Sequence, residues 1–203
     1  KFFEQAVKSP KLDKRSPMYV TLMRDLGALY RAVGRDKEAA DCYEVVFDAL
    51  QNHAKYGLDS RTRKELLADP EVDYEKLGQV FLTAERSELA IQAFQKAAQV
   101  RKAHAANLSF NLSRVYLQTK QPDKALEELQ KYFDAQRQAK GAAAYQLLVD
   151  ILKEQGKADQ TLPRLEDLAE KDSRNSTLQF FLAAEYARAG QLEKAETLYK
   201  KTP

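Results

Sequence analysis

Two histidines, one cysteine and several adjacent carboxylates are the residues of this 203-residue chain that could do chemistry. Neither His53 nor His104 has a second histidine, a cysteine or a carboxylate at a metal-ligand spacing such as His-Glu-x-x-His. Cys42 has no adjacent histidine and falls at helical core spacing, where a thiol usually packs and does not react. Glu127 and Glu128 lie among lysines in an amphipathic pattern, which is typical of a solvated helix face. We therefore expect no catalytic residue and no metal site.

The glycines and the charges exclude further classes of protein. None of the seven glycines lies in a glycine-rich phosphate loop, so the sequence predicts no cofactor and no enzymatic activity. The 33 basic and 30 acidic residues are interspersed, without the run of like charge that nucleic-acid binding favours. The apolar runs fall far short of the roughly 20 residues that a membrane span needs, so we expect no membrane insertion. The single cysteine excludes an internal disulfide but does not fix the compartment.

Helices must position these side chains, because only seven glycines and six prolines interrupt a composition rich in helix-forming residues. A leucine followed, in most cases, by a small residue recurs along the chain. It occurs at Leu26-Gly27, Leu77-Gly78, Leu112-Ser113, Leu148-Val149 and Leu182-Ala183. The steps are 51, 35, 36 and 34 residues, which indicates a period near 34 with one insert of 17.

Each repeat reads as two antiparallel helices. The small second member of the pair allows the partner helix to approach closely, and an aromatic or leucine side chain three residues later continues the apolar face of the first helix. A closing position follows four residues after that, and a glycine there can adopt the left-handed conformation that ends a helix. This position holds Gly34, Glu85, Lys120, Gly156 and Gly190.

The same pattern predicts caps and core residues. Asp36 and Ser87 lie where the second helix of a pair needs an N-cap. The aromatic positions are expected to be largely buried, and they include Tyr30, Phe81, Phe94 and Tyr116.

These offsets resemble the tetratricopeptide repeat, whose pattern places Trp, then Leu-Gly, then Tyr in the first helix and Ala and Phe in the second. The resemblance covers nearly the whole chain and implies an all-α superhelix, or solenoid, of tandem helix-turn-helix units that winds right-handed. The leading tryptophan is replaced throughout, by Met23 in the first full repeat and Tyr74 in the second, and Thr161 replaces one alanine.

One repeat array is expected to span residues 1–203. Neither end resembles a polar capping repeat, so we expect a fragment of a longer array. The predicted divisions are a partial repeat (1–16), repeat 1 (17–53), an insert (54–70), repeat 2 (71–105), repeat 3 (106–141), repeat 4 (142–175) and a truncated repeat 5 (176–203). The predicted helices after the first are 17–33, 37–55, 73–83, 88–104, 106–119, 122–137, 142–155, 161–171, 176–189 and 192–201.

The insert and one proline make sharper predictions. The preceding helix should extend to about Tyr56, break at Gly57 and be followed by a short helix over 61–67, either as a solvated surface insertion or as a contact for a partner. Pro163 should lie in the first turn of its helix, with Thr161 as N-cap, because proline is tolerated there.

Two functions remain open for such an array. The first is a scaffold that binds a peptide or a partner protein in its concave groove. The alternative is a structural spacer or a self-associating array, so homo-oligomerisation stays possible. In the family that the chain resembles, the first helix of each pair lines the groove, and the basic clamp of some relatives is not expected here because Ala28 stands where that clamp has an asparagine. The resemblance selects as groove-facing Arg24, Arg31, Gln79, Asn107, Phe110, Arg114, Gln146, Asp150 and Phe180.

Overall fold

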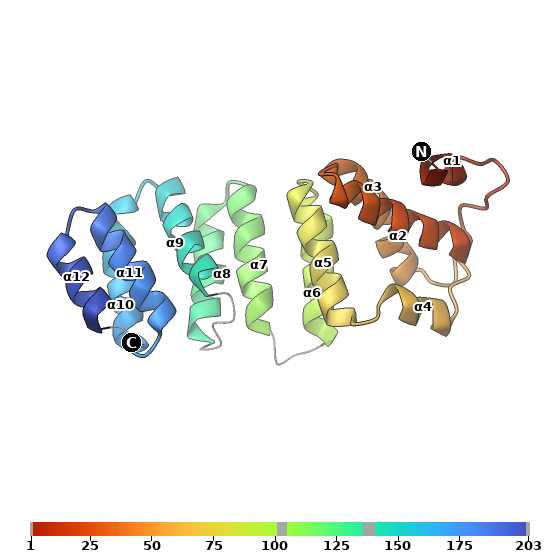
Figure 1. Cartoon of the computed structure of the whole chain (residues 1–203). Helices are drawn as coiled ribbons and strands as arrows, with labels where there is room; N and C mark the ends of the chain where they lie inside the picture. Colours follow the sequence, from red (N-terminus) through yellow and green to blue (C-terminus); the bar gives the residue numbers. More distant parts are fainter. Residues whose placement is uncertain (1, 101–104, 136–140, 202–203) are drawn as a thin grey trace. The chain divides into compact units, whose positions relative to one another are not determined.

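The structure is a computed structural model that describes residues 2–100, 105–135 and 141–201. Over these ranges it contains twelve α-helices, a short 3₁₀ turn and no strand, which confirms the all-α class (Figure 1). The helices are α1 (Phe2–Val7), α2 (Pro17–Ala32), α3 (Asp36–Gln51), α4 (Ser60–Leu66), α5 (Pro70–Thr83), α6 (Ser87–Val100), α7 (Ala105–Gln118), α8 (Pro122–Asp134), α9 (Ala142–Glu154), α10 (Thr161–Lys171), α11 (Ser176–Arg188) and α12 (Leu192–Lys201).

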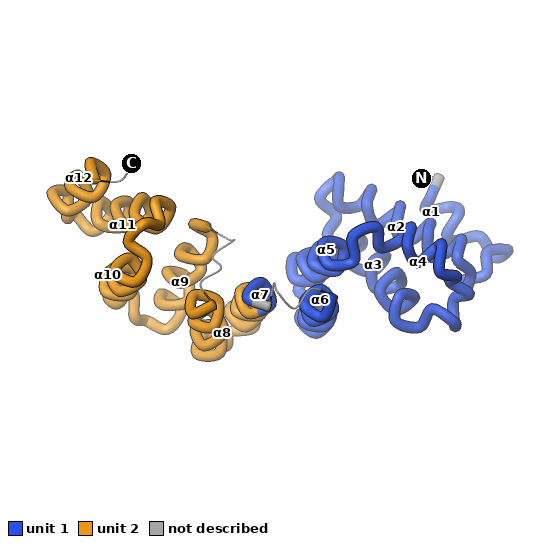
Figure 2. Tube along the Cα trace, turned by 90° about the horizontal axis from the view of Figure 1, so that it is seen from below, with its two compact units in different colours: residues 1–108 blue, residues 109–203 orange. Residues whose placement is uncertain are grey.

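The chain divides into two compact units, residues 1–108 and 109–203 (Figure 2). In the first unit, α2 packs against α3 and α5 packs against α6. In the second, α8 packs against α9, α10 against both α9 and α11, and α11 against α12. The tandem helix-turn-helix units are thus confirmed, whereas the single array over the whole chain and its right-handed winding stay predictions.

The turn between the two helices of a pair has the same backbone conformation each time. Its closing residue has a positive φ at Gly34, Gly156 and Gly190, as expected, and also at the non-glycine residues Glu85 (61°) and Lys120 (58°). The next residue donates its N–H to a carbonyl five positions back, as Gln121 does to Tyr116 at 2.8 Å. Carbonyl groups at the end of the first helix accept hydrogen bonds in this way. The left-handed conformation therefore occurs at this position of the repeat whether or not the residue is glycine.

Small residues bring the two helices of a pair together. A Cβ added to Gly78 would lie 2.4 Å from a ring carbon of Phe94, so α5 and α6 could not pack as they do with a larger residue there. In α7 the equivalent residue is Ser113, which is buried and whose hydroxyl donates to the carbonyl of Ala125 in α8 at 2.7 Å. The small second member of the leucine pair therefore has the packing role expected of it.

The predicted aromatic core is only partly correct. Phe81 and Phe94 are fully buried. Tyr30 is only half-buried, because its hydroxyl reaches the surface and donates to Glu4 at 2.8 Å. Tyr116 is also half-buried, with the ammonium group of Lys124 over its ring. Tyr186, at the same repeat position, is buried and donates its hydroxyl to Glu166, so burial of this position differs between repeats.

The expected N-caps are wrong by one residue. Asp36, Ser87 and Thr161 are each the first residue of their helix and not the cap. The tight turn explains this for α3: Arg35, directly after the left-handed Gly34, already accepts the first helical hydrogen bond through its carbonyl. Side-chain caps occur instead where the helix follows a longer connection, at Ser16, Asp59, Asp69 and Asn175.

Helix limits otherwise differ from the predictions by a few residues. The second of the predicted helices ends at residue 51 and not 55, and the helix predicted to begin at 73 begins at 70, where Pro70 occupies the first turn. Pro163 lies in the first turn of α10, as predicted. Residues 101–104 and 136–140, including His104 and the predicted ends of two helices, lie outside the described residues.

The insert begins with a turn that the sequence did not predict. The helix does not extend to Tyr56, because the chain leaves α3 after Gln51. The carboxylate of Asp48 accepts hydrogen bonds from Asn52 (2.6 Å), Lys55 (2.8 Å) and the hydroxyl of Tyr56 (2.6 Å). Three donors on one carboxylate hold residues 52–56 in a turn, which the chain leaves through the left-handed Gly57.

The rest of the insert packs into the first unit. The short helix predicted here is α4, and Tyr56, Leu58 and Leu66 are buried in one apolar cluster. The cluster continues into α2 and α3 through Val20 and Val46. The insert therefore does more than cover the surface, since it completes part of the core of the first unit.

None of the described helices is both long enough and apolar enough to cross a membrane.

Candidate functional site

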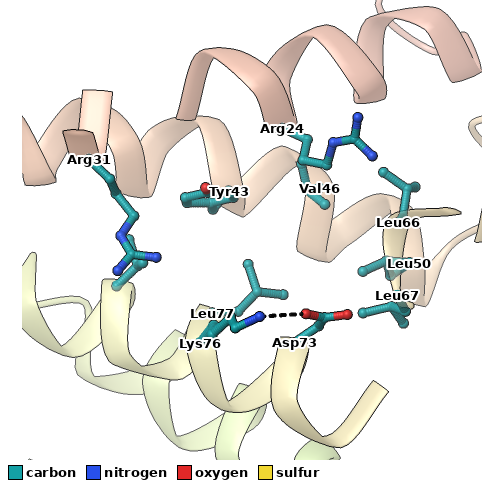
Figure 3. Close-up of a pocket in the computed structure, with 11 residues that line it drawn as sticks. Arg24, Arg31, Tyr43, Val46, Leu50, Leu66, Leu67, Asp73, Lys76 and Leu77 are labelled. Atoms are coloured by element: carbon teal, nitrogen blue, oxygen red, sulfur yellow. Dashed lines mark hydrogen bonds and ion pairs between the residues drawn. The ribbon is translucent and has the colours of Figure 1, made fainter. Parts of the chain in front are cut away.

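A pocket of about 150 Å³ lies in the first unit, where the insert meets the helices on either side of it (Figure 3). The first helices of two successive repeats, α2 and α5, form two of its walls, while α3 and the insert supply the rest. It is lined by Arg24, Arg31, Tyr43, Val46, Leu50, Leu66, Leu67, Asp73, Lys76, Leu77 and Val80.

The floor of the pocket is apolar. Val46 and Leu50 come from α3, and Leu77 and Val80 come from α5. These side chains are present because the helices pack through a leucine or valine every three or four residues. The insert adds Leu66 and the residue after it, so its chain closes one side of an otherwise open gap between two repeats.

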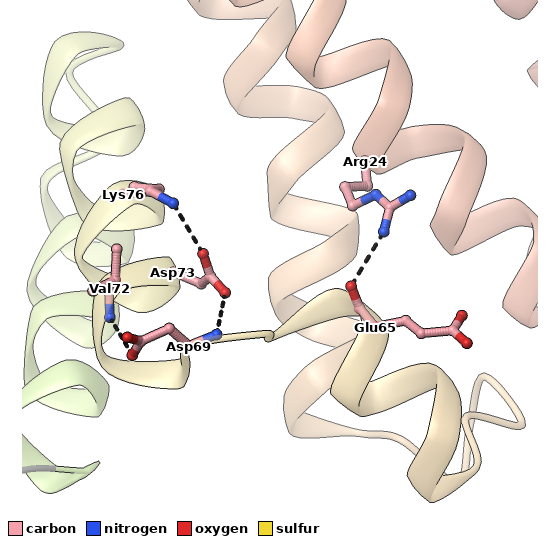
Figure 4. A network of polar contacts seen from close by, with 6 residues as sticks. All are labelled: Arg24, Glu65, Asp69, Val72, Asp73 and Lys76. Atoms are coloured by element: carbon pink, nitrogen blue, oxygen red, sulfur yellow. Dashed lines mark hydrogen bonds and ion pairs between the residues drawn. The ribbon is translucent and has the colours of Figure 1, made fainter.

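Arg24 is held beside the insert by two interactions. Its guanidinium group lies 2.8 Å from the carboxylate of Asp25 and donates at 3.3 Å to the main-chain carbonyl of Glu65 (Figure 4). That carbonyl belongs to the last turn of α4, where helix carbonyls lack partners and carry partial negative charge. Arg24 therefore acts as a link between α2 and the insert.

A second set of contacts fixes the junction between the insert and α5. The carboxylate of Asp69 caps the helix by accepting from the N–H of Val72 at 3.4 Å. Asp73 accepts from the N–H of Asp69 at 3.0 Å and lies 3.2 Å from the ammonium group of Lys76 (Figure 4). Lys76 thus reaches the pocket with its charge already balanced by Asp73.

Arg31 is in a different electrostatic position. It is exposed, extends from α2 toward α5 (Figure 3), and forms no ion pair with any carboxylate of the described residues. Burial raises the pKa of the neighbouring Tyr43 hydroxyl, and the nearby Arg31 guanidinium partly offsets that rise. The phenol therefore stays neutral at ordinary pH, and the positive charge of Arg31 is not compensated within the pocket.

Of the nine residues selected from sequence, Arg24 and Arg31 line this pocket. Gln79 lies on the neighbouring α5, half-buried and outside the pocket. Asn107 lies in α7, also half-buried.

The remaining selected residues lie in the second unit. Phe110 is buried against Tyr132, with ring centres 5.5 Å apart, and Arg114 lies over the Phe110 ring at 6.0 Å. Gln146 and Asp150 are exposed and bond to each other at 2.9 Å, and Phe180 is exposed beside Tyr199. The Phe110 ring therefore serves the interior of the second unit and does not face solvent.

Sequence reasoning missed most of the pocket, including the two leucines of the insert and the pair Asp73 and Lys76. The signal that was available is the doubled leucine at 66 and 67 inside an otherwise charged segment. Two adjacent large apolar residues in such a segment are unlike a purely solvated loop. Where Leu66 and Leu67 lie in the structure, however, depends on the turn that the Asp48 carboxylate stabilises.

The residues first considered for chemistry are not brought together. Cys42 is buried, which raises the pKa of its thiol to about 11, and it contributes to the packing between α2 and α3. Among the described residues, no group of three histidine, cysteine or carboxylate side chains is arranged to hold a metal ion. The lining of the pocket offers apolar contact and the guanidinium group of Arg31, which has no carboxylate partner among the described residues.

The repeat pattern was also compared with known proteins. The family model described as tetratricopeptide repeat matches residues 75–142, which run from α5 to the start of α9. No curated protein matches the chain. Among solved structures, the crystal structure of MamA protein matches 76% of this chain and 92% of that chain, at 23% sequence identity and a TM-score of 0.42. Residues 75–142 therefore match the tetratricopeptide repeat, and the helix pairs on either side of this segment have the same helix-turn-helix form.

Proposed function

We propose that this chain is a protein-interaction module that binds an extended segment of a partner protein along α2 and α5, with the pocket as its anchor point. Tetratricopeptide repeats generally mediate protein–protein interactions. The location of the binding site and the kind of segment bound are specific to this chain. They rest on the pocket, which has an apolar floor and, at its edge, one arginine without a carboxylate partner in the described structure.

The pocket has the composition of a recognition site. Binding sites are concave and mostly apolar, with a few polar groups that fix orientation. Here the apolar floor is formed by helix side chains that are already packed, so little entropy is lost when a ligand side chain enters. A partner segment of a few residues could lay one side chain on the floor while its backbone passes the polar rim of Arg24 and Lys76.

The proposal is tested by selecting binders to the whole chain from a random displayed peptide library. The variant Leu67→Trp should fill the pocket, since Leu67 lines it and is only half-buried. The matched control is Leu192→Trp, the same change at a side chain that is 67% exposed in the second unit. We expect selected peptides to lose at least about tenfold in affinity with Leu67→Trp and to bind Leu192→Trp as they bind the parent.

Circular dichroism of both variants checks that each is folded. An absence of enriched peptides, or binders indifferent to Leu67→Trp, would count against the proposal.

Self-association is the second candidate function, and one observation favours it. Phe180, Leu192 and Tyr199 leave large apolar side chains exposed on α11 and α12. If these surfaces join copies of the chain, sedimentation will show a species of twice the monomer mass that dissociates on dilution. Leu192→Glu should then restore the monomer, since a charge buried in an apolar contact is costly.

A further inference from the structure

We infer that the pocket selects one bulky apolar side chain, of leucine or phenylalanine size, that lies next to a carboxylate in the same partner segment. The apolar side chain occupies the floor and the carboxylate pairs with Arg31. This inference rests on the proposed function and specifies the chemistry of the ligand: a short acidic and apolar motif and not a basic one.

The volume of the pocket limits the apolar part of the ligand. About 150 Å³ is available, bounded by Val46, Leu50, Leu66 and Leu77 among others. A cavity of about this size with leucine-like walls accommodates a benzene ring in other proteins. One phenyl or isobutyl group therefore fits, and two such groups do not.

The charges around the pocket define the polar part. Three cations line it, but Arg24 is engaged by Asp25 and the Glu65 carbonyl, and Lys76 is engaged by Asp73. Only Arg31 among these cations lacks a carboxylate partner in the described structure. A guanidinium group binds a carboxylate through two parallel hydrogen bonds, which fixes direction as well as charge.

The insert determines which arginine remains available. The carbonyl at the end of α4 holds Arg24 toward the insert, and Leu66 and Leu67 form the wall on that side. The cation without a carboxylate partner in the described structure is therefore Arg31, which lies beside Tyr43 and away from the insert (Figure 3). A ligand carboxylate must consequently lie toward the Arg31 end, with its apolar neighbour extending toward Leu66.

Small probes test this chemistry without knowledge of the natural partner. The probes are 3-phenylpropionate, 3-phenylpropionamide and 3-phenylpropylamine, which share one ring and differ in charge. Binding to the full chain is followed by NMR of labelled leucine and valine methyl groups, assigned for Leu66, Leu67, Leu77 and Val80. Affinities of molecules this small fall in the millimolar range, which this measurement covers.

We expect all the response to concentrate on the pocket methyl groups. The carboxylate probe should bind about tenfold more tightly than the amide, and the amine should bind more weakly than both, because only the carboxylate pairs with Arg31. Arg31→Gln should lower the affinity for the carboxylate to that for the amide and leave the amide unchanged. Arg164→Gln, an exposed arginine of the second unit, removes the same charge and should change neither.

Several results would overturn the inference. One is that none of the three probes shifts the pocket methyl groups; another is that the acid and the amide bind equally to the parent chain. A third is that Arg164→Gln weakens the acid as much as Arg31→Gln does, since the effect would then come from net charge. Library peptides rich in lysine and arginine would also contradict the motif while leaving the proposed function standing, whereas a library without binders removes the proposed function itself.

Discussion

Replacing Gly78 by alanine should destabilise the first unit, although alanine is the better helix former. An added Cβ would lie 2.4, 2.5 and 2.9 Å from three ring carbons of Phe94, whereas ordinary contact begins at 3.4 Å. The ring must retreat by about 1 Å, and Phe94 is only 1% exposed, so its neighbours must move with it. Overpacking of this kind costs about 3 kcal/mol at its upper end.

The helix itself gains from the same substitution. Alanine is favoured over glycine inside a helix by about 1 kcal/mol. The net effect of Gly78→Ala is therefore a loss of about 2 kcal/mol. The equivalent Gly27 gives the comparison, because there the nearest atoms, of Cys42 and Tyr43, lie at 3.2 Å. A shift of a few tenths of an ångström suffices, so Gly27→Ala should change stability by less than about 0.5 kcal/mol.

Urea unfolding followed by far-ultraviolet circular dichroism measures both variants, and the double variant Gly78→Ala with Phe94→Leu provides the control. The smaller leucine leaves room for the new methyl group. Phe94→Leu should therefore lower the free energy of unfolding less when Gly78→Ala is present than when it is absent. The packing argument fails if Gly78→Ala is as stable as the parent, or if the two substitutions are simply additive.

Three further predictions concern the turns and contacts described above. Glu85→Gly and Lys120→Gly should each raise the free energy of unfolding by about 0.5 kcal/mol, because relief of the left-handed strain exceeds the added freedom of the unfolded chain; Gly156→Ala should lower it, and urea midpoints that move the opposite way would contradict the turn geometry. Hydrogen bonds from a lysine and a tyrosine of the insert turn lower the pKa of Asp48 below its ordinary 3.8, so its stabilisation is complete above that value and is lost as the pH falls through the lowered pKa. The midpoint temperature of unfolding should therefore fall less with decreasing pH in Asp48→Asn than in the parent. An unchanged dependence of the midpoint on pH would count against this role of Asp48. Ser113→Ala should cost about 1 kcal/mol, since it removes a buried hydrogen bond, as urea unfolding can show.

The repeat architecture could be predicted because it depends on local spacing. A leucine pair, an aromatic residue and a closing position recur at fixed offsets, and these give both helices and the turn between them. The left-handed conformation was expected only of a glycine at the closing position, but the backbone keeps it at Glu85 and Lys120 as well. The predicted N-caps Asp36 and Ser87 were wrong because this turn uses the residue directly after the closing position as the cap, which leaves no connection for a capping side chain.

The pocket could not be predicted in the same way. Its geometry depends on one carboxylate, Asp48, accepting from three donors after α3, and on the return of the insert to bury Leu66 in the same apolar cluster as Val20. Such contacts join residues that no periodic pattern relates. Arg24 and Arg31 were selected through the resemblance to a family, which indicates a helix face. The contact of Arg24 with the Glu65 carbonyl, and the lack of a carboxylate partner for Arg31 among the described residues, depend on tertiary structure.

The buried insert changes what counts as the exchangeable module of this protein. Repeat proteins are commonly recombined by cutting at the period and joining units from different parents, because each unit contacts mainly its neighbours. A cut that removes residues 54–70 would restore a regular period here, but it would also take away Tyr56, Leu58 and Leu66 and expose Val20 and Val46. The smallest transplantable piece therefore runs from residue 17 to residue 100, from the start of α2 to the end of α6, and the insert within it is a poor place for a tag or a foreign loop.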